Sequence, residues 1–226
     1  MVKATLELIR TVERSGKTYD YLWLISGQDY PIVPVKEIVR RLEENKGINY
    51  LSTLLPGDDR YNWYKKLYEV WYPPWINKDT IVVKAFKHIY KIATGGYRHT
   101  FKLFTKRKPF EGELAFGSQW WTLTSEAAFE ILHYNDKHPN VLEYFKNTII
   151  PDECFFQTLF MIGTYRDKRK PSLTFSYLEK NGRHSETMTG KKYEIIREAG
   201  KQKCFARKFD DKSQGLIWII EKMDGD

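Results

Sequence analysis

The sequence is poor in cysteine and has no long apolar run. Only two of its 226 residues are cysteine, Cys154 and Cys204, and no C-x-x-C spacing occurs. A disulfide scaffold and a zinc ribbon are therefore disfavoured, and we expect two reduced, buried thiols. No apolar run approaches the roughly 18–20 residues of a membrane span. Residues 1–14 carry Glu7 and Glu13 and lack a signal-peptide cleavage site, so we expect a cytoplasmic protein.

Several motifs of nucleotide and metal enzymes are also missing. The sequence has no P-loop, no G-x-S-x-G and no G-x-G-x-x-G. None of its five histidines has metal-site spacing to another ligand. The Asp58-Asp59 and Asp210-Asp211 pairs do not follow an apolar strand, as an acidic metal–nucleotide motif would. We expect neither a divalent metal nor a bound cofactor.

What is present fits a soluble globular protein. Hydrophobic residues make up 42% and charged residues 29% of the chain, and without a clear linker we expect one domain over residues 1–226. The net charge of +8 favours an anionic partner such as a phosphorylated substrate, an anionic membrane or nucleic acid. Aromatic residues reach 15%, with seven tryptophans. They suit a carbohydrate or nucleobase cleft, although aromatic cores are also common.

The first part of the chain has an α/β pattern. Residues 1–14 carry helical apolar spacing, and residues 21–25 (YLWLI) form an apolar run of strand length. A helix with proline at its first position is predicted over residues 34–44, and a short strand over residues 48–51. This order predicts a sheet with parallel elements, in which ligands lie beyond the carboxyl ends of strands. The polar turn of residues 26–29 occupies such an end.

The remaining chain alternates helical and strand patterns. An aromatic, irregular segment is expected first, and polar or basic loops separate several of the later elements. We predict an irregular segment at 56–74, strands at 120–123, 173–177 and 203–207, helices at 125–134, 139–147, 213–223 and from 151 onward, and loops at 166–171 and 181–190.

Two carboxylates stand at a predicted helix start, in the segment Pro151-Asp152-Glu153. Acidic residues at this position commonly complement the helix dipole, which is worth about 0.3–1 kcal/mol when they are exposed. Alternatively, one of them is a general base held by a rigid helix terminus. The residue pattern leaves both interpretations open.

Two further segments carry possible ligand contacts. In CFARKFD, the adjacent Arg207 and Lys208 lie between phenylalanines, where they could bind a diphosphate or form a surface pair beside a core strand. In GSQWW, a small-residue turn leads into paired tryptophans at residues 117–121. That turn either lets a sugar approach the backbone or is structural.

Four motifs in order resemble one enzyme family. They are YLWLISGQDYPI, GSQWWTLTSEA, IPDECFFQTL and CFARKFD, at residues 21–32, 117–127, 150–159 and 204–210. Across nearly the whole chain the sequence resembles the core-2/I-branching β-1,6-N-acetylglucosaminyltransferases and the peptide O-xylosyltransferases, especially short bacterial relatives. The resemblance implies a GT-A-like α/β fold, with a mixed sheet flanked by helices, and inverting transfer of a sugar, GlcNAc in our first interpretation, from a UDP-sugar.

The resemblance also implies roles for individual residues. It places the catalytic base on Glu153 and the diphosphate contacts on Lys208, Arg207 and Arg183, without a divalent metal. It implies a donor and acceptor pocket that includes Gln28, Asp29, Ser118, Trp120 and Asp152, and acceptor contacts from Arg60, Lys65, Lys66 and Tyr177.

One departure from the family concerns the start of the chain. Family members begin with a further strand–helix–strand unit that helps to hold the uridine, whereas residues 1–14 already resemble the helix that leads into the SGQD strand. This motivates the alternative of a non-catalytic carbohydrate-binding module or a degenerate transferase fragment. For the enzyme we expect a glycan or lipid-linked saccharide acceptor in capsule or exopolysaccharide synthesis, peripheral contact with anionic membrane, and no nucleic acid.

Overall fold

The computed structural model describes residues 1–69, 71, 80–82, 84, 85, 88, 108–148, 150–178 and 185–223. The chain divides into two compact units, each assembled from three separate stretches of sequence. The first unit comprises Met1–Gly16, Thr53–Gly117 and Phe129–Gly163, and the second comprises Lys17–Ser52, Ser118–Ala128 and Thr164–Asp226. Helices flank mixed sheets, so the predicted α/β class is confirmed.

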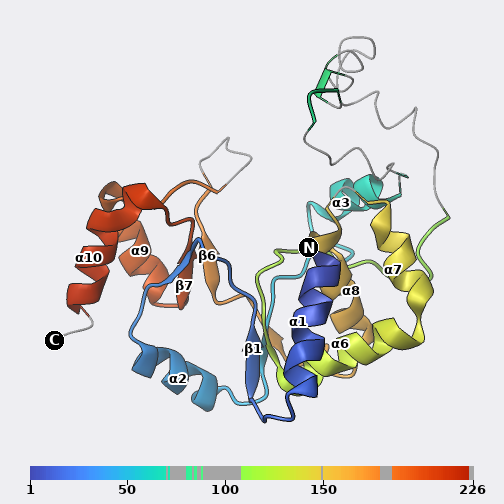
Figure 1. The fold of residues 1–226 in the computed structure, drawn as a ribbon, viewed down its shortest axis with the longest axis horizontal. Coiled ribbons are helices and arrows are strands. Elements are labelled where there is room, and N and C mark those ends of the chain that lie inside the picture. Colours follow the sequence, from blue (N-terminus) through green and yellow to red (C-terminus); the bar gives the residue numbers. More distant parts are fainter. Residues whose placement is uncertain are drawn as a thin grey trace. The chain divides into compact units, whose positions relative to one another are not determined.

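The first unit is mainly helical (Figure 1). Its helix α6 begins in the second unit and runs into the first. Its elements are α1 (Val2–Arg14), α3 (Tyr61–Tyr68), most of α6 (Ser125–Lys137), α7 (Pro139–Lys146), the short 3-10 helix η2 (Pro151–Glu153) and α8 (Phe155–Ile162).

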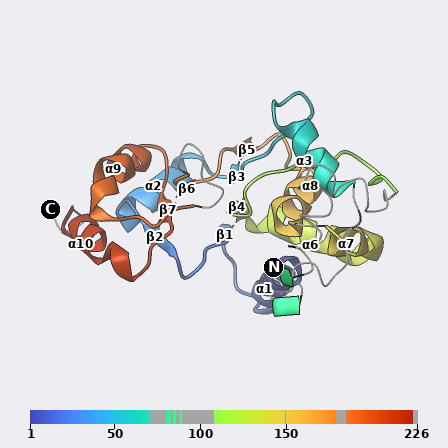
Figure 2. The ribbon, with the colours of Figure 1, turned by 90° about the horizontal axis from the view of Figure 1, so that it is seen from above.

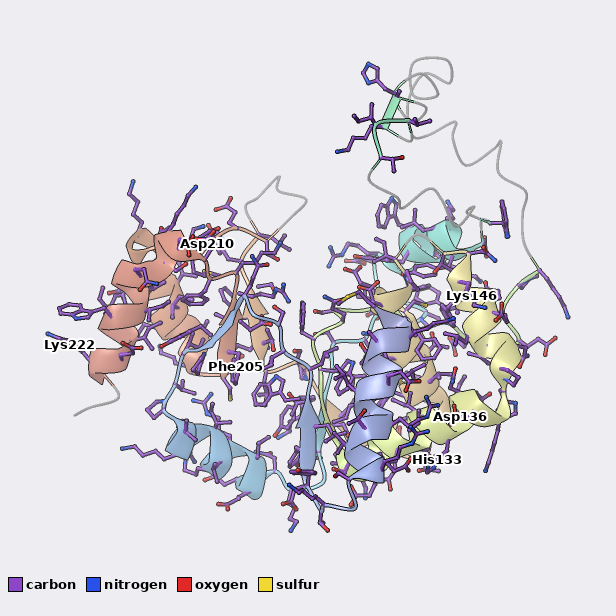
Figure 3. The ribbon with its side chains drawn as sticks, viewed as in Figure 1. His133, Asp136, Lys146, Phe205, Asp210 and Lys222 are labelled. Carbon is purple, nitrogen blue, oxygen red and sulfur yellow. The ribbon has the colours of Figure 1, made fainter. Side chains whose placement is uncertain are left out.

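Helix α1 is held against α6 by an ion pair and by a hydrogen-bond contact. The guanidinium of Arg10 lies 2.6 Å from the Asp136 carboxylate, and the Glu13 carboxylate lies 2.6 Å from His133 Nε2. Figure 3 labels His133 and Asp136 on α6 beside α1. The apolar residues at the predicted helical spacing are buried, so the amphipathic pattern correctly identified this helix.

The second unit contains two small sheets. In the first, the strand order is β1-β4-β3-β5, with antiparallel pairs except for the parallel pair β3–β5. In the second, the order is β2-β7-β6, with β2 antiparallel and β6 parallel to β7. The strands are β1 (Tyr21–Trp23), β2 (Asp29–Pro31), β3 (Asn49–Tyr50), β4 (Thr122–Thr124), β5 (Arg169–Lys170), β6 (Thr174–Ser176) and β7 (Phe205–Arg207).

The predicted parallel elements are therefore present, but β1 and β3 are not neighbours, because β4 is inserted between them. The hydrogen bond from the Thr124 amide to the Asn49 side chain, 2.9 Å long, helps to hold β4 beside β3. Asn49 is completely buried, so its amide group serves the sheet rather than solvent.

Helices α2 (Val35–Glu44), α9 (Tyr193–Gly200) and α10 (Gln214–Met223), with η3 (Gly190–Lys192) and η4 (Asp211–Ser213), complete the second unit. Ile196 of α9 and Leu216 of α10 share one buried cluster with Ala206 of β7. Figures 1 and 2 both show these two helices beside the β2-β7-β6 sheet. Trp23 of β1 and Phe205 of β7 are in edge-to-face contact, with ring centroids 4.7 Å apart, and both pack on one buried cluster, so residues of both sheets share this core.

Four elements differ from the sequence predictions. Strand β2, which begins at the last residue of the predicted turn 26–29, was not predicted. The segment 56–74, expected to be irregular, contains α3, and the expected loop 166–171 contains the short strand β5. Helix α9 was not predicted. Cys154 and Cys204 are buried and unpaired, as expected. Within the described residues, no helix combines the length and apolar character needed to cross a bilayer.

Candidate active site

Glu153 lies at the end of the 3-10 turn η2, in the first unit. Proline at the first position of this turn has no amide hydrogen to leave unsatisfied, which favours the start of a helix there. The turn does not continue into α8, because Cys154 (φ −137°, ψ −39°) breaks the helical path. The prediction of one helix starting at Pro151 was therefore wrong, and Glu153 occupies a short, separately held turn.

Hydrogen bonds connect this turn and the start of α8 to the first residue of the GSQWW motif and to the segment before it. The Gly117 amide donates to the Glu153 carbonyl oxygen at 2.8 Å. One turn later in the chain, the Thr158 hydroxyl accepts from the Ala115 amide at 3.0 Å. On the other side, the Tyr68 hydroxyl donates to the carbonyl oxygen of Ile150. The position of Glu153 is thus set by partners on both sides of the turn.

An aromatic cluster covers the turn. Tyr61, Tyr64 and Tyr68 lie on one face of α3 and contact the buried Phe116 ring, with centroid separations of 5.2, 5.6 and 5.0 Å. Their spacing of three and four residues is that of one helical face. We call Tyr61, Tyr64, Tyr68 and Phe116 the tyrosine cluster. Two of its members, Tyr64 and Tyr68, interact electrostatically with the half-buried Glu153.

These surroundings favour the uncharged form of Glu153. Burial raises the pKa of the Glu153 carboxyl, and the neighbouring charge of Asp152 raises it further. A carboxylate with a raised pKa is a stronger base than an exposed glutamate. The arrangement can therefore accept a proton from a hydroxyl group of a bound molecule.

In the second unit, three of the sequence motifs meet at Arg207. Its guanidinium carbon lies 3.7 Å from the centroid of the Trp120 ring, and its Nη1 lies 3.6 Å from Oδ1 of Asp29. Asp29 and Arg207 are also direct partners across the antiparallel β2–β7 pair. Only 7% of the Arg207 side chain and none of the Asp29 side chain is exposed. Arg207 is thus a buried, stacked cation rather than a surface residue.

Burial lowers the pKa of Arg207, while the Asp29 charge opposes that shift. The Asp29 carboxylate also accepts a hydrogen bond from the Ser26 amide. The Asp29 carboxylate thus contacts both Ser26 of the SGQD turn and the Arg207 guanidinium. The cluster of Asp29, Trp120 and Arg207 therefore fixes the end of β7, where Lys208 follows directly.

Lys208 is half-buried, and its backbone is bound on both sides. Its amide donates to the Glu186 carbonyl at 3.2 Å, and its carbonyl oxygen accepts from the Met188 amide at 2.7 Å. Among the residues that the structure describes, the Lys208 ammonium has no ion-pair partner. A charged group on a fixed backbone and without a competing carboxylate is suited to binding an anion.

The other predicted site residues have varied surroundings. Gln28 is exposed, although its carbonyl oxygen accepts from the Phe209 amide, and the Ser118 hydroxyl accepts from the Trp120 amide. The ring of Tyr177 faces the Lys192 ammonium at 4.7 Å. Arg60, Lys65 and Lys66 lie at the start and along the exposed side of α3, Asp152 adjoins Glu153, and Arg183 lies outside the described residues.

Within the first unit, then, the structure brings Asp152 and Glu153 together with the tyrosine cluster. Within the second, it brings Asp29 and Trp120 together with Arg207. Sequence reasoning did not identify Tyr64 or Phe116, although the helical spacing of the three tyrosines was available as a signal. Across the described part of the chain, no group of three or more histidine, cysteine, aspartate or glutamate side chains could hold a metal ion.

Comparison with known proteins agrees with these motifs. A human protein described as a beta-1,3-galactosyl-O-glycosyl-glycoprotein beta-1,6-N-acetylglucosaminyltransferase is 26% identical over 159 residues. That match covers 70% of this chain and 31% of the human protein, so the chain spans about a third of the length of this relative. Residues 1–203 match the family described as Core-2/I-Branching enzyme. Since the match extends over most of the 226 residues, the chain belongs to the Core-2/I-Branching enzyme family.

Proposed function

We propose that the protein is an inverting glycosyltransferase that moves a sugar, most simply GlcNAc, from a UDP-sugar to a hydroxyl group of a glycan. Family membership and the similarity to a β-1,6-N-acetylglucosaminyltransferase support this class of reaction. The observation that carries the assignment is the half-buried Glu153 carboxylate on its fixed turn, with its raised pKa.

In this reaction Glu153 is the general base. Its carboxylate takes the proton of the acceptor hydroxyl while that oxygen attacks the anomeric carbon of the donor sugar. A new carbon–oxygen bond forms on one face of the sugar, and the bond to UDP breaks on the opposite face. The leaving UDP carries away the electron pair of the broken bond, so the anomeric configuration inverts.

The proposed diphosphate ligand is Lys208, whose ammonium would stabilise the negative charge that develops on the leaving group. Arg207 supports this site from its buried position on Trp120, and Arg183 remains a further candidate from the family resemblance. Basic side chains can neutralise a departing diphosphate without a divalent cation. The proposal therefore includes metal-independent transfer.

The acceptor side is assigned to the basic start and exposed side of α3. Arg60, Lys65 and Lys66 would contact an anionic or strongly hydrated acceptor such as a lipid-linked saccharide. The net charge of +8 supports peripheral contact with an anionic membrane surface at the site of polysaccharide synthesis. Salt-sensitive binding to vesicles that contain phosphatidylglycerol is the expected result, and equal binding to neutral vesicles would remove this part of the proposal.

The experiment that tests the proposed activity measures release of UDP from UDP-GlcNAc in the presence of excess EDTA and a panel of glycan acceptors. Acceptor-dependent release of UDP is expected, with UDP-xylose as the second donor to test. If no donor yields UDP although the folded protein binds glycans, the chain is a carbohydrate-binding module and the transferase assignment is wrong.

A further inference from the structure

Tyr64 differs from the other two tyrosines of the tyrosine cluster in how its hydroxyl is used. The Tyr61 hydroxyl donates to the Leu114 carbonyl oxygen, and the Tyr68 hydroxyl donates to the Ile150 carbonyl oxygen. Among the described residues, the Tyr64 hydroxyl has no hydrogen-bond partner. Tyr64 is nevertheless half-buried, a situation in which a phenol hydroxyl usually finds one. Within the described residues, the Tyr64 hydroxyl therefore makes no hydrogen bond that stabilises the fold.

The ring of Tyr64 is held close to the candidate base. It stacks on Phe116 with an interplanar angle of 21° and a centroid separation of 5.6 Å. Phe116 directly precedes Gly117, whose amide donates to the Glu153 carbonyl at 2.8 Å. Burial raises the pKa of Tyr64, and the charge of the Glu153 carboxylate raises it further, so the two groups also interact electrostatically. The phenol consequently keeps its proton at neutral pH and remains a donor.

We propose that Tyr64 is the positioning residue for Glu153, its hydroxyl donating a hydrogen bond to a water molecule that in turn donates to the carboxylate. The inference rests on the proposed function, because positioning matters only if Glu153 is the base. Within the described residues the Glu153 carboxylate has no side-chain or backbone donor. Tyr68, one turn further along the same face of α3, donates to the Ile150 carbonyl oxygen directly before η2, so this face of α3 adjoins the turn that carries Glu153. A bridging water can complete a pair of one donor and one acceptor at little cost.

Other titratable groups act on the same site. Asp152 adjoins Glu153 on η2 and raises the pKa of its carboxyl. Tyr68 of α3 and Cys154 remain protonated, because burial raises the pKa of each. Arg60, at the start of α3, opposes the upward shift of the Tyr64 pKa. None of these neighbours is removed by changing Tyr64, so they act equally in the variants compared below.

The direction in which Tyr64 changes the pKa of Glu153 depends on which form of the carboxyl group accepts the hydrogen bond. A donor favours the charged carboxylate and lowers its pKa, in partial opposition to burial and Asp152. Removing the Tyr64 hydroxyl should therefore raise the pKa of Glu153. The Tyr64→Phe variant keeps the ring and its stacking on Phe116, so that only the donor is lost.

The test is a carbon-13 NMR titration of the full chain with labelled glutamate side chains, in which Glu153→Gln identifies the signal. In Tyr64→Phe we expect the titration midpoint of Glu153 to move upward by roughly half a unit or more. The matched control is Tyr61→Phe, which lies on the same face of α3 and whose hydroxyl is bound to Leu114 instead. Its midpoint should stay at the wild-type value. Equal midpoints in the wild type and Tyr64→Phe would overturn the proposal.

A second readout uses the pH profile of UDP release from UDP-GlcNAc. Tyr64→Phe should shift the acidic limb upward, while a merely structural loss would lower the rate equally at every pH. The two failures can be told apart. If the wild type releases no UDP from any donor, the proposed function is wrong, and retained turnover in Glu153→Gln refutes the assigned base. An unchanged Glu153 midpoint in Tyr64→Phe refutes only the positioning role.

Discussion

The Gly117 amide donates a 2.8 Å hydrogen bond to the carbonyl oxygen of Glu153. This bond joins two motifs more than thirty residues apart, since Gly117 opens the GSQWW motif and Glu153 ends the PDE turn. The turn has only three residues and no side-chain cap, so its position depends on such outside partners. Gly117 therefore contributes to the candidate base through its backbone.

Two substitutions of Gly117 should distinguish the effect of losing its amide donor from the effect of adding a side chain. Gly117→Pro removes the amide donor and is expected to lower turnover about tenfold or more, because a displaced base loses its alignment with the acceptor. Gly117→Ala keeps the amide at a position without a positive φ and should retain most of the turnover. Steady-state UDP release checks both variants. Equal rates would show that the bond has no functional role.

The pH dependence of the reaction follows from the raised pKa of Glu153. A base must be deprotonated to act, so turnover should fall as the pH drops through this raised pKa, above the range of an exposed glutamate. Asp152→Asn removes the like charge and should move the acidic limb to lower pH. Burial, the larger cause, remains in that variant, so the limb should not return to the value of an exposed glutamate. A limb unaffected by Asp152→Asn would contradict this assignment of causes.

Lys208 and Arg207 should respond differently to removal. Lys208→Ala should weaken UDP binding by about 10- to 100-fold, which corresponds to the roughly 1.5–3 kcal/mol of a hydrogen bond to a charged group. It should leave the free energy of unfolding nearly unchanged. Isothermal titration with UDP in excess EDTA measures the affinity, and Lys212→Ala, at an exposed lysine of η4, is the control.

In Arg207→Ala the main effect should be on stability. The variant leaves the Asp29 carboxylate buried without its cation and removes the stacking on Trp120. A loss on the order of 3 kcal/mol is expected in the free energy of unfolding, measured with denaturant. An Arg207→Ala protein as stable as the wild type but unable to bind UDP would show instead that Arg207 contacts the diphosphate directly.

The tyrosine cluster should contribute measurably to the stability of the first unit. Phe116 is completely buried and contacts three tyrosine rings. Phe116→Ala should therefore reduce the free energy of unfolding by about 3–5 kcal/mol. Trp63→Ala, at an exposed aromatic on the same helix, should have little effect. Comparable losses in the two variants would argue against the cluster as a core.

Local patterns in the sequence predicted the elements with their own apolar pattern better than those that depend on distant partners. The helix at α2 was placed to within one residue, because apolar spacing and Pro34 mark its start. Strand β5 has only two charged residues, Arg169 and Lys170, and exists because it pairs with β3. A pairing between residues more than a hundred positions apart leaves no local signal. The insertion of β4 between β1 and β3 was unpredictable for the same reason.

The residues of the candidate site come from motif resemblance and stay predictions, whereas the contacts that support them come from the structure. Motif resemblance selected Glu153 and Lys208, and the sequence identified both as chemically suited to their roles. The sequence could not indicate that Arg207 is buried against Trp120, because nothing in an adjacent Arg-Lys pair shows which of the two side chains faces the protein interior. Nor did it predict α3, since aromatic residues are compatible with helix, strand and loop, and here packing on Phe116 decides.

The most direct measurement for the central claim is the turnover of Glu153→Gln, compared with Asp152→Asn and with UDP affinity measured on the same samples. We predict loss of transfer in Glu153→Gln by at least about a thousandfold, with UDP affinity nearly intact. Because ionised Glu153 is partly desolvated and next to Asp152, its folded-state pKa exceeds the unfolded value. Its charge therefore costs stability as the pH rises through that window, and the glutamine variant should be at least as stable at neutral pH. Retained transfer by folded Glu153→Gln would contradict the assignment of the base.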